Sequence, residues 1–353
     1  MLFYVAKSQT YNYYAGSTFV GSHHENFEFE ILSTEQSELD CLNEKKLFDE
    51  WKVLHSKNYE NFYEEHKRFR IFKENLNHIM SHNSQSEITF DLELNSMTDW
   101  TREEYTALLG KHVPTYETYF GLRPELSGDI KDEVDWVKEG KVSEVKNQGQ
   151  CGSCWSFSTT GAIESLYAIQ KGEMITLSEQ QLVDCAGGSY QNNGCNGGLM
   201  DYAFRYVEDN GLVEESEYPY EARDGNCRIP DAPTYTIGGF VDVARNELAL
   251  KKAVSSQPVS VAIEADQTAF QFYHSGVLSS SKCGDNLDHG VLVVGYGEED
   301  GVMFWKIKNS WGSEWGDDGY IKIERTESKR STGTCGIAMS ASYPTLNNQV
   351  VDK

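Results

Sequence analysis

Residues 147–172 read NQGQCGSCWSFSTTGAIESLYAIQKG, a turn containing Gly and Ser that runs directly into a helical pattern. Apolar side chains recur at helical spacing through Phe157, Ile163 and Leu166. Cys154 should therefore begin a helix, where the macrodipole and the unpaired N–H groups favour an anion. We expect its thiol to ionise more readily than a free cysteine and to act as a nucleophile.

Cys151 and Cys154 also form a CxxC pair, which is typical of half a zinc site or of a redox centre. No second CxxC follows that could complete a zinc site. A thioredoxin-like pair would stand early in a βαβ unit, whereas this pair precedes a helical region. The pattern therefore favours neither a metal centre nor a redox centre.

A reactive thiolate needs a proton-transfer partner, and His289 in LDHGVLVVGYG (287–297) is the best placed of the 9 histidines. Asn309 in KNSWGSEWG (308–316) follows the next apolar run. A histidine beside a strand is more often a structural residue than a catalytic one. Sequence context alone therefore leaves both interpretations of His289 open.

Helical signals continue to about residue 210 and then give way to strands. Beyond about residue 235, short β-branched or aromatic runs such as VSVAIEA (259–265) are bounded by Gly. A helical first half and a strand-rich second half predict an α+β body of two subdomains.

The segment before this body has its own pattern. Six residues spaced by 4, 4, 3, 4 and 4 share one face of a predicted helix: Glu64, Arg68, Phe72, Asn75, Ile79 and Asn83. Alternation over residues 89–100 predicts a short strand, and TREEY from Thr101 predicts a helix with Glu104 at the capping-box position. A stretch containing Pro and Gly puts a domain boundary near residues 122–131. Residues 1–43 have no period, and we expect a poorly ordered extension.

The 353-residue chain has 55 acidic and 31 basic residues and a formal charge of −24. That charge opposes binding to nucleic acid or to anionic membranes, so neither partner is expected. No run of about 18 apolar residues occurs, so no membrane-spanning helix is expected. The apolar opening Leu2 to Ala6 ends at Lys7, and no secretory signal is evident.

Five segments over residues 130–344 form an ordered series: VDWVKEGKVSEVKNQGQCGSCWSF, LSEQQLVDC, GCNGGLMDYAF, DHGVLVVGYG and KNSWGSEWGDDGY. Together they resemble the papain family of cysteine proteases, with cathepsin L as the most similar branch. The helix face at 64–83 resembles the ERFNIN motif of cathepsin L-like inhibitory propeptides. A second motif of such propeptides, GxNxFxD, has Glu93 and Met97 in place of its Gly and Phe, whereas Asn95 and Asp99 match.

The resemblance implies roles for five side chains. Cys154 would be the nucleophile, and His289 as imidazolium would protonate the leaving amine. Asn309 would orient the His289 ring, and Trp311 would shield that bond, although a Trp could equally pack in the core. The side chain of Gln148 and the N–H of Cys154 would donate to the oxyanion.

The pairing of the other six cysteines of the body is open from the sequence alone. The resemblance implies the bridges Cys151–Cys195, Cys185–Cys227 and Cys283–Cys335, with Cys41 unpaired. Such bridges indicate an oxidising compartment, so we expect a lysosome-like location or secretion.

A substrate groove follows from the same resemblance. Gly152, Gly197 and Gly198 would approach an extended peptide closely. The pocket for the side chain two residues before the cut, with the neighbouring groove, would be formed by Leu199, Met200, Ala262, Leu287, Asp288, Gly290, Trp311 and Ser340. The pocket lining is apolar, so we expect Leu, Phe or Val to be preferred over Arg. No long insertion resembles the occluding loop of cathepsin B, so we expect endopeptidase cleavage.

We therefore expect a papain-like α+β body over residues 130–353, with a helical left domain, a β-barrel-like right domain and the active-site cleft between them. Residues 44–121 would be a helical inhibitory propeptide and residues 122–131 an activation linker, and low pH would loosen the propeptide by protonating carboxylates. The expected function is a monomeric cysteine endopeptidase, made as a zymogen, that acts on proteins and peptides without a cofactor or metal. The alternatives are a catalytically silent papain-like interaction or matrix protein and a metal-binding module.

Overall fold

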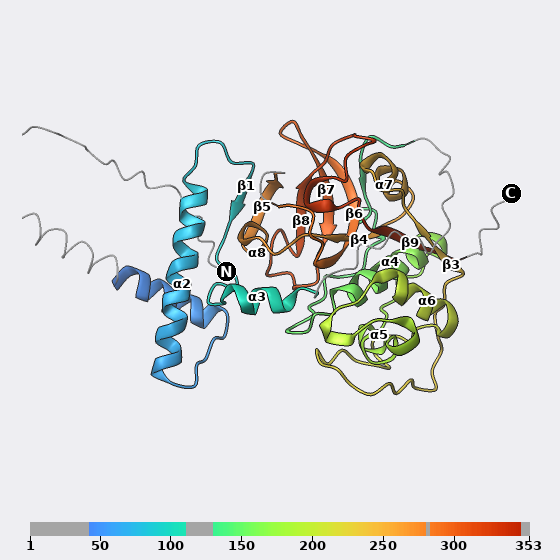
Figure 1. The fold of residues 1–353 in the computed structure, drawn as a ribbon, viewed down its shortest axis with the longest axis horizontal. Helices are drawn as coiled ribbons and strands as arrows, with labels where there is room; N and C mark the ends of the chain where they lie inside the picture. The colour runs from blue at the N-terminus through green and yellow to red at the C-terminus, as the bar shows by residue number, and fades with distance from the viewer. Residues whose placement is uncertain (1–41, 111–129, 280–282, 347–353) are drawn as a thin grey trace, which may run out of the picture. The chain divides into compact units, whose positions relative to one another are not determined.

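The computed structural model describes residues 42–110, 130–279 and 283–346 (Figure 1). The described residues up to Lys57 and those from Asn58 onward form two separate units. In the first unit residues 42–54 are helical, and Lys45 and Asp49 form an ion pair at 2.8 Å. Most of the expected extension at 1–43 and of the expected linker at 122–131 lies outside the described residues.

The second unit combines helices with a large sheet. Its helices are α2 (Phe62–Asn83), α3 (Arg102–Leu108), α4 (Cys154–Gln170), α5 (Glu179–Cys185), α6 (Met200–Asn210), α7 (Glu247–Val254) and α8 (Thr268–Gln271), with short 3₁₀ turns at Gly188–Tyr190, Gly194–Asn196 and Thr334–Gly336. Its strands are β1 (Phe90–Leu92), β2 (Val134–Asp135), β3 (Gly239–Asp242), β4 (Val259–Ile263), β5 (Tyr273–Leu278), β6 (His289–Glu299), β7 (Val302–Lys308), β8 (Tyr320–Glu324) and β9 (Ala341–Thr345).

Across the described residues the strands form one nine-stranded sheet in the order β1-β5-β8-β7-β6-β4-β9-β3, with β2 paired to β6. The neighbours are antiparallel except β5 and β8, which are parallel. No pairing of β1 with β3 closes this sheet within those residues, so it is open. The α+β fold is confirmed, but the barrel-like closure expected for the right domain is not observed.

The helix α4 lies between the two halves of the body. It packs on β6, β4 and β9 on one side and on α5 and α6 on the other (Figure 1). Its residues from Cys154 to Leu166 are all buried. A helix that is covered on all sides needs no polar face, which fits a sequence made mostly of small and apolar residues, and the buried Glu164 is paired with Lys146 at 2.8 Å.

The helix α2 carries the predicted one-sided pattern. Phe72 and Ile79 of that face are buried, whereas Arg68 donates to both carboxylate oxygens of Glu104 at 2.7 Å and to Glu64 at 2.7 Å. The capping box predicted at Thr101 and Glu104 is present and begins α3.

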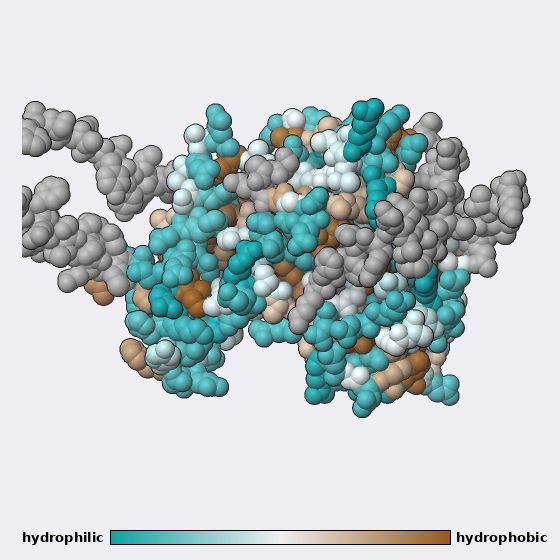
Figure 2. Space-filling model, in the orientation of Figure 1, coloured by the Kyte–Doolittle hydropathy of each residue, from teal (hydrophilic) through white to brown (hydrophobic). Residues whose placement is uncertain are grey.

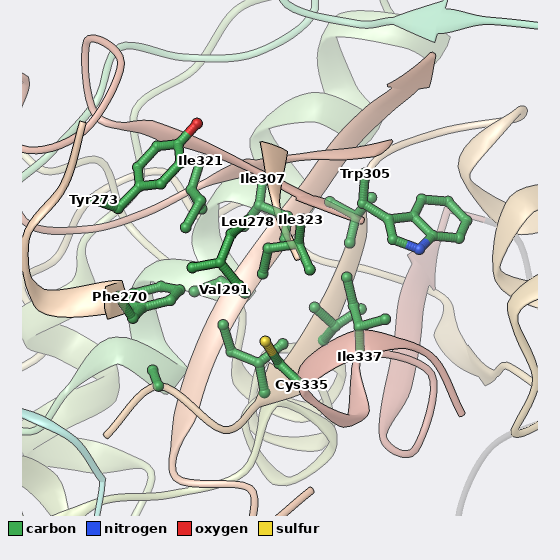
Figure 3. Close-up of a cluster of buried hydrophobic side chains, with 14 of the residues drawn as sticks. Phe270, Tyr273, Leu278, Val291, Trp305, Ile307, Ile321, Ile323, Cys335 and Ile337 are labelled. Carbon is green, nitrogen blue, oxygen red and sulfur yellow. The ribbon is translucent and has the colours of Figure 1, made fainter. Parts of the chain in front are cut away.

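One hydrophobic cluster joins the segment before the body to the strand-rich half. Phe90, Leu92, Met97, Tyr105 and Leu108 belong to the same buried cluster as residues of β5 to β8. Figure 3 shows the centre of this cluster, where Phe270 and Tyr273 face Val291, Ile307, Ile321 and Ile323. Burial of apolar surface therefore holds residues 90–108 on the body, since each square ångström removed from water contributes about 25 cal/mol.

The surface is mainly hydrophilic on the face shown in Figure 2, in keeping with the many charged residues. Three disulfides cross-link the described part of the body, at Cys151–Cys195, Cys185–Cys227 and Cys283–Cys335. These are the pairings that the resemblance implied. No helix among the described residues is long and apolar enough to cross a membrane.

Candidate active site

Cys154 is the first residue of α4, as the sequence predicts. Its side chain is buried, and its sulfur accepts hydrogen bonds from the backbone N–H groups of Gly290, at 3.3 Å, and of Gly110. In the part of the chain that the structure describes, it is the one cysteine without a disulfide. The thiol therefore lies where α4, β6 and the segment before the body meet.

His289 begins β6, where pairing with Ile263 of β4 fixes its backbone. Its Nε2 lies 2.8 Å from Oδ1 of Asn309, and this oxygen also accepts from the N–H of Ser310 at 2.8 Å. Because an oxygen only accepts, Nε2 carries the ring proton and Nδ1 is left as the basic nitrogen. Nδ1 is buried and has no hydrogen-bond partner among the described residues.

Aromatic rings enclose this histidine. The Trp311 ring lies 4.9 Å from the His289 ring, and Phe270 meets His289 edge-on at 6.1 Å. Trp315 packs on Trp311 at 5.1 Å. The arrangement excludes water from the His289–Asn309 bond, so the shielding expected of Trp311 fits the geometry.

Gln148 is held at both ends of its amide. Its Oε1 accepts from the Ser310 hydroxyl at 2.7 Å and from Nε1 of Trp311 at 3.1 Å. Its Nε2 donates to the carbonyl of Leu108 at 3.0 Å and to that of Cys151 at 2.8 Å. A backbone carbonyl therefore already occupies the position in which Gln148 could stabilise an oxyanion.

Residues 108–110 cross the site. A Cβ built on Gly110 would lie 3.9 Å from Sγ of Cys154, 3.8 Å from the Cα of Gly197 and 3.4 Å from the carbonyl oxygen of Asp288. The carbonyl of Leu109 approaches Gly152 in the same way. The groove that was expected to receive substrate is therefore filled by the chain's own segment.

This occlusion changes the ionisation of both central groups. Burial raises the pKa of the Cys154 thiol to about 11, although N–H groups donate to its sulfur. Burial also lowers the pKa of His289 to about 4, against the opposing effect of its bond to Asn309. The expectation of an easily ionised thiol is therefore wrong for this state, because loss of solvation outweighs the helix N-terminus.

Asp288 is a third perturbed group at the site. Burial raises its pKa to about 7, and the nearby carboxylates of Asp266 and Glu264 act in the same direction, whereas the N–H of Ala265 donates to its Oδ1 at 2.8 Å. The sequence had assigned Asp288 to the substrate groove, and the structure places it beside Gly110.

The residues expected around the substrate pocket gather at one place. Leu199, Met200, Ala262 and Leu287 belong to one buried cluster with Trp155. A Cβ on Gly290 would lie 3.3 Å from Sδ of Met200, and a Cβ on Gly198 would meet the Trp155 ring at 2.7 Å. The carbonyl of Ser340 accepts from the N–H of Ala262 at 3.0 Å.

The residues of the two pro-motifs make contacts that their spacing alone did not reveal. Asn75 donates to the carbonyl of Thr98 at 2.9 Å, and Asn83 exchanges two hydrogen bonds with Leu92. The Nδ2 of Asn95 donates to the carbonyl of Gln271 in the body at 2.7 Å. Asp99 accepts from the hydroxyl of Tyr59 at 2.9 Å.

Ser310 is the functional candidate that the sequence analysis missed. Its N–H orients Asn309 and its hydroxyl orients Gln148, so it touches both supporting amides. Its position directly after Asn309 was the one feature of the sequence that could have indicated a functional role for Ser310. Among the described residues no group of three or more His, Cys, Asp or Glu side chains could hold a metal ion.

Comparison with known proteins places this site in context. Residues 130–345 match the family model of the papain family cysteine proteases, and residues 48–105 match that of the cathepsin propeptide inhibitor domain. The chain is 46% identical over 329 residues to the probable cysteine protease RD21B of Arabidopsis thaliana, covering 90% of this chain and 70% of that protein. It is 47% identical over 314 residues to the probable cysteine protease RDL2 of the same plant, covering 86% and 85%.

Two solved structures of precursors share the fold. Digestive procathepsin L 3 from the larval midgut of Tenebrio molitor superposes with a TM-score of 0.77 at 41% identity, over 86% of this chain and 99% of that one. A recombinant stem bromelain precursor superposes with a TM-score of 0.78 at 38% identity, again over 86% and 99%.

Proposed function

This chain belongs to the papain family of cysteine proteases and carries a cathepsin propeptide inhibitor domain, and from that premise we propose that Cys154, His289 and Asn309 hydrolyse peptide bonds once that domain has left. Residues 58–110 are called the pro-segment below. Gln148 is the fourth residue of the site and donates to the oxyanion.

The single observation that carries this proposal is the hydrogen bond from Nε2 of Gln148 to the carbonyl of Leu108 at 3.0 Å. It supports a site that binds a peptide main chain beside the Cys154 sulfur, with an oxyanion donor already aimed at a carbonyl oxygen. With the pro-segment bound, burial raises the pKa of the thiol to about 11 and lowers that of the imidazole to about 4, so neither group carries near neutral pH the charge that hydrolysis requires.

Departure of the pro-segment returns water to the site. Hydration lowers the thiol pKa and raises the imidazole pKa, so the proton moves from Sγ of Cys154 to Nδ1 of His289. The thiolate attacks the scissile carbonyl, and Nε2 of Gln148 and the N–H of Cys154 stabilise the oxyanion. The imidazolium then protonates the leaving amine, and water releases the acyl group from the sulfur.

Substitution of Cys154 tests the proposal. Cys154→Ala should abolish hydrolysis of peptide substrates in the processed protein, and a thiol-directed epoxide should label the processed wild type at Cys154. Hydrolysis that persisted in Cys154→Ala would contradict the assignment. A processed wild type that is neither active nor labelled would favour the catalytically silent alternative.

The apolar residues that gather around Met200 support a preference for apolar side chains two residues before the cut. Leu199, Met200, Ala262 and Leu287 lie together in one buried apolar cluster, and a cation placed among them would lose its hydration without gaining a partner. Matched peptides that carry Leu, Phe, Val or Arg at this position test the preference, and equal kcat/KM values for Leu and Arg would overturn it.

We further propose a location and an oligomeric state for the protein. Three disulfides support an oxidising location, either a lysosome-like compartment or the outside of the cell. The protein acts as a monomeric endopeptidase. Fractionation of the source tissue tests the location, and sedimentation of the processed protein tests the monomer.

A further inference from the structure

The pro-segment places a cation against the body next to the active site. Nη2 of Arg102 lies 2.7 Å from Oδ2 of Asp266, which stands in the loop between β4 and α8. Among the described residues, Arg102 is the one basic side chain in an ion pair with Asp266. The carboxylate therefore loses its cation when the pro-segment leaves.

This contact lies on the wall of the site that carries His289. Three residues after Arg102, the hydroxyl of Tyr105 donates to the carbonyl of Ala265, the neighbour of Asp266. The Tyr105 ring meets Trp311 edge-on at 5.8 Å, and Trp311 in turn packs on His289. Because His289 protonates the leaving amine, this wall faces the half of the substrate that departs first.

Among the described residues, the body offers Asp266 negative neighbours and no replacement cation. The carboxylates of Glu264 and Asp266 lie close enough to Asp288 to raise its pKa. The carboxylate of Glu264 is already satisfied by the N–H groups of Gly284 and Asn286. Within the described part of the body, the carboxylate of Asp266 accepts a neutral hydrogen bond from Nε2 of Gln267 at 2.7 Å and no charged one. The negative potential at this wall is therefore available to a ligand.

We propose that Asp266 is a specificity-determining residue of the processed enzyme, which binds a Lys or Arg side chain of the substrate on the leaving-group side of the cut. Arg102 occupies this position in the zymogen. The inference rests on the proposed function, because the site must hydrolyse peptides for the preference to be expressed. It is independent of the apolar pocket, which receives the opposite half of the substrate.

Quenched-fluorescence peptides test the inference on the full chain after activation by limited proteolysis. One series keeps Leu two residues before the cut and carries Lys, Ala or Glu at the first, second or third position after it. Wild type should cleave the best Lys peptide with a kcat/KM about two- to fivefold above that of its Ala counterpart, the range typical of an exposed ion pair. The advantage should shrink as the salt concentration rises.

Asp266→Asn should remove the preference for Lys peptides and leave kcat/KM for the Ala peptides unchanged. Asp266→Lys should instead cleave the Glu peptides with a higher kcat/KM than the Ala peptides. Glu173→Gln is the matched control, since it removes one exposed acid at the far end of α4 from Cys154 and should keep the Lys preference. Equal rates for Lys and Ala peptides in wild type, or a preference that survives in Asp266→Asn, would overturn the inference. Loss of all cleavage together with loss of epoxide labelling would instead overturn the proposed function.

Discussion

Gln148 shows how individual side chains prepare the site. Its amide can turn about its own axis, yet only one orientation points Nε2 at the substrate carbonyl. The Ser310 hydroxyl and Nε1 of Trp311 both donate to Oε1 and so fix that orientation. An oxyanion donor that is held in place before reaction needs no reorganisation in the transition state.

The two bonds to Oε1 lead to a prediction on catalysis. Ser310→Ala and Trp311→Phe should each lower kcat about two- to tenfold, the cost of one hydrogen bond, with KM little changed. Trp311→Phe keeps an aromatic ring over His289, so it removes the indole N–H more than the packing. The double variant should approach the loss of about 10²- to 10³-fold that follows removal of an oxyanion donor. Effects on KM alone would contradict this role for Oε1.

The sequence could single out Cys154, His289 and Asn309 from their local surroundings, and it pointed to Gln148 through the family resemblance of the segment that it shares with Cys154. It could not reveal the role of Ser310, since the bond to Gln148 joins residues 162 positions apart and depends on how two loops pack. It also predicted the wrong shift for the Cys154 thiol. The helix N-terminus is visible in the local sequence, whereas the burial that dominates comes from Gly110 and its neighbours across the groove.

At the scale of elements, β1 attaches the pro-segment to the body by adding to the edge of the sheet at β5. Phe90 pairs with Gly276 and Leu92 with Tyr273, and the N–H of Glu93 donates to the carbonyl of Phe272 at 2.9 Å. This register brings the carboxylate of Glu93 to 2.7 Å from Nδ1 of His274. Alternation in residues 89–100 predicted the strand, but nothing local could name a partner that lies more than 180 residues away.

The Glu93–His274 pair gives this attachment a pH dependence. The hydrogen bond to Glu93 raises the pKa of His274 above its ordinary 6.5, with Asp91 and Asp317 acting in the same direction, and His274 lowers the pKa of Glu93 below its ordinary 4.5. The histidine's contribution is complete below pH 6.5 and is lost as the pH rises through the raised pKa. The carboxylate's contribution is complete above pH 4.5 and is lost as the pH falls through the lowered pKa. The pair is therefore strongest between those two values.

Mild acid should accordingly tighten this contact, and only stronger acid should loosen it. We expect Glu93→Gln to speed release of the pro-segment most at pH 5 to 6, between the two ordinary pKa values, and progressively less as the pH rises through the raised pKa of His274. Release is measured as the rate of processing of the full chain by an added protease at each pH. Glu87→Gln, an exposed acid just before β1, is the control and should leave the profile unchanged. An equal effect of Glu93→Gln at every pH would contradict the pairing.

The bidentate pair of Arg68 with Glu104 joins α2 to α3. Lys cannot reproduce two parallel hydrogen bonds, so Arg68→Lys should lower the free energy of unfolding of the pro-segment by about 1–3 kcal/mol. The full chain should then be cleaved several-fold faster at residues 58–110 by limited proteolysis. Arg70→Lys changes an exposed residue of the same helix and should have no such effect. Equal sensitivity of the two variants would argue against the Arg68–Glu104 pair as a support of this fold.

At the scale of the whole second unit, one hydrophobic cluster contains both the pro-segment and the strand-rich half of the body. The sequence predicts an α+β body and a helical pro-segment separately, because each has its own periodicity. It does not predict that Phe90, Met97 and Tyr105 complete the body's core, nor that the sheet stays open, since both depend on contacts between distant elements. Release of the pro-segment must therefore expose apolar surface as well as the site.

This coupling predicts that the ionisation of Cys154 reports on the pro-segment. In the zymogen the thiol has a pKa raised to about 11 and the imidazole of His289 a pKa lowered to about 4, so neither is charged at neutral pH. Hydration of the emptied groove favours the thiolate and the imidazolium together.

Thiolate absorbance in the ultraviolet should therefore appear only in strong alkali for the full chain, but already near neutral pH after processing. Absorbance detects charge directly, so it is unaffected by the steric cover that Gly110 gives the sulfur. The difference titration between wild type and Cys154→Ala isolates this one thiol, and identical titrations before and after processing would show that burial by the pro-segment does not keep Cys154 neutral.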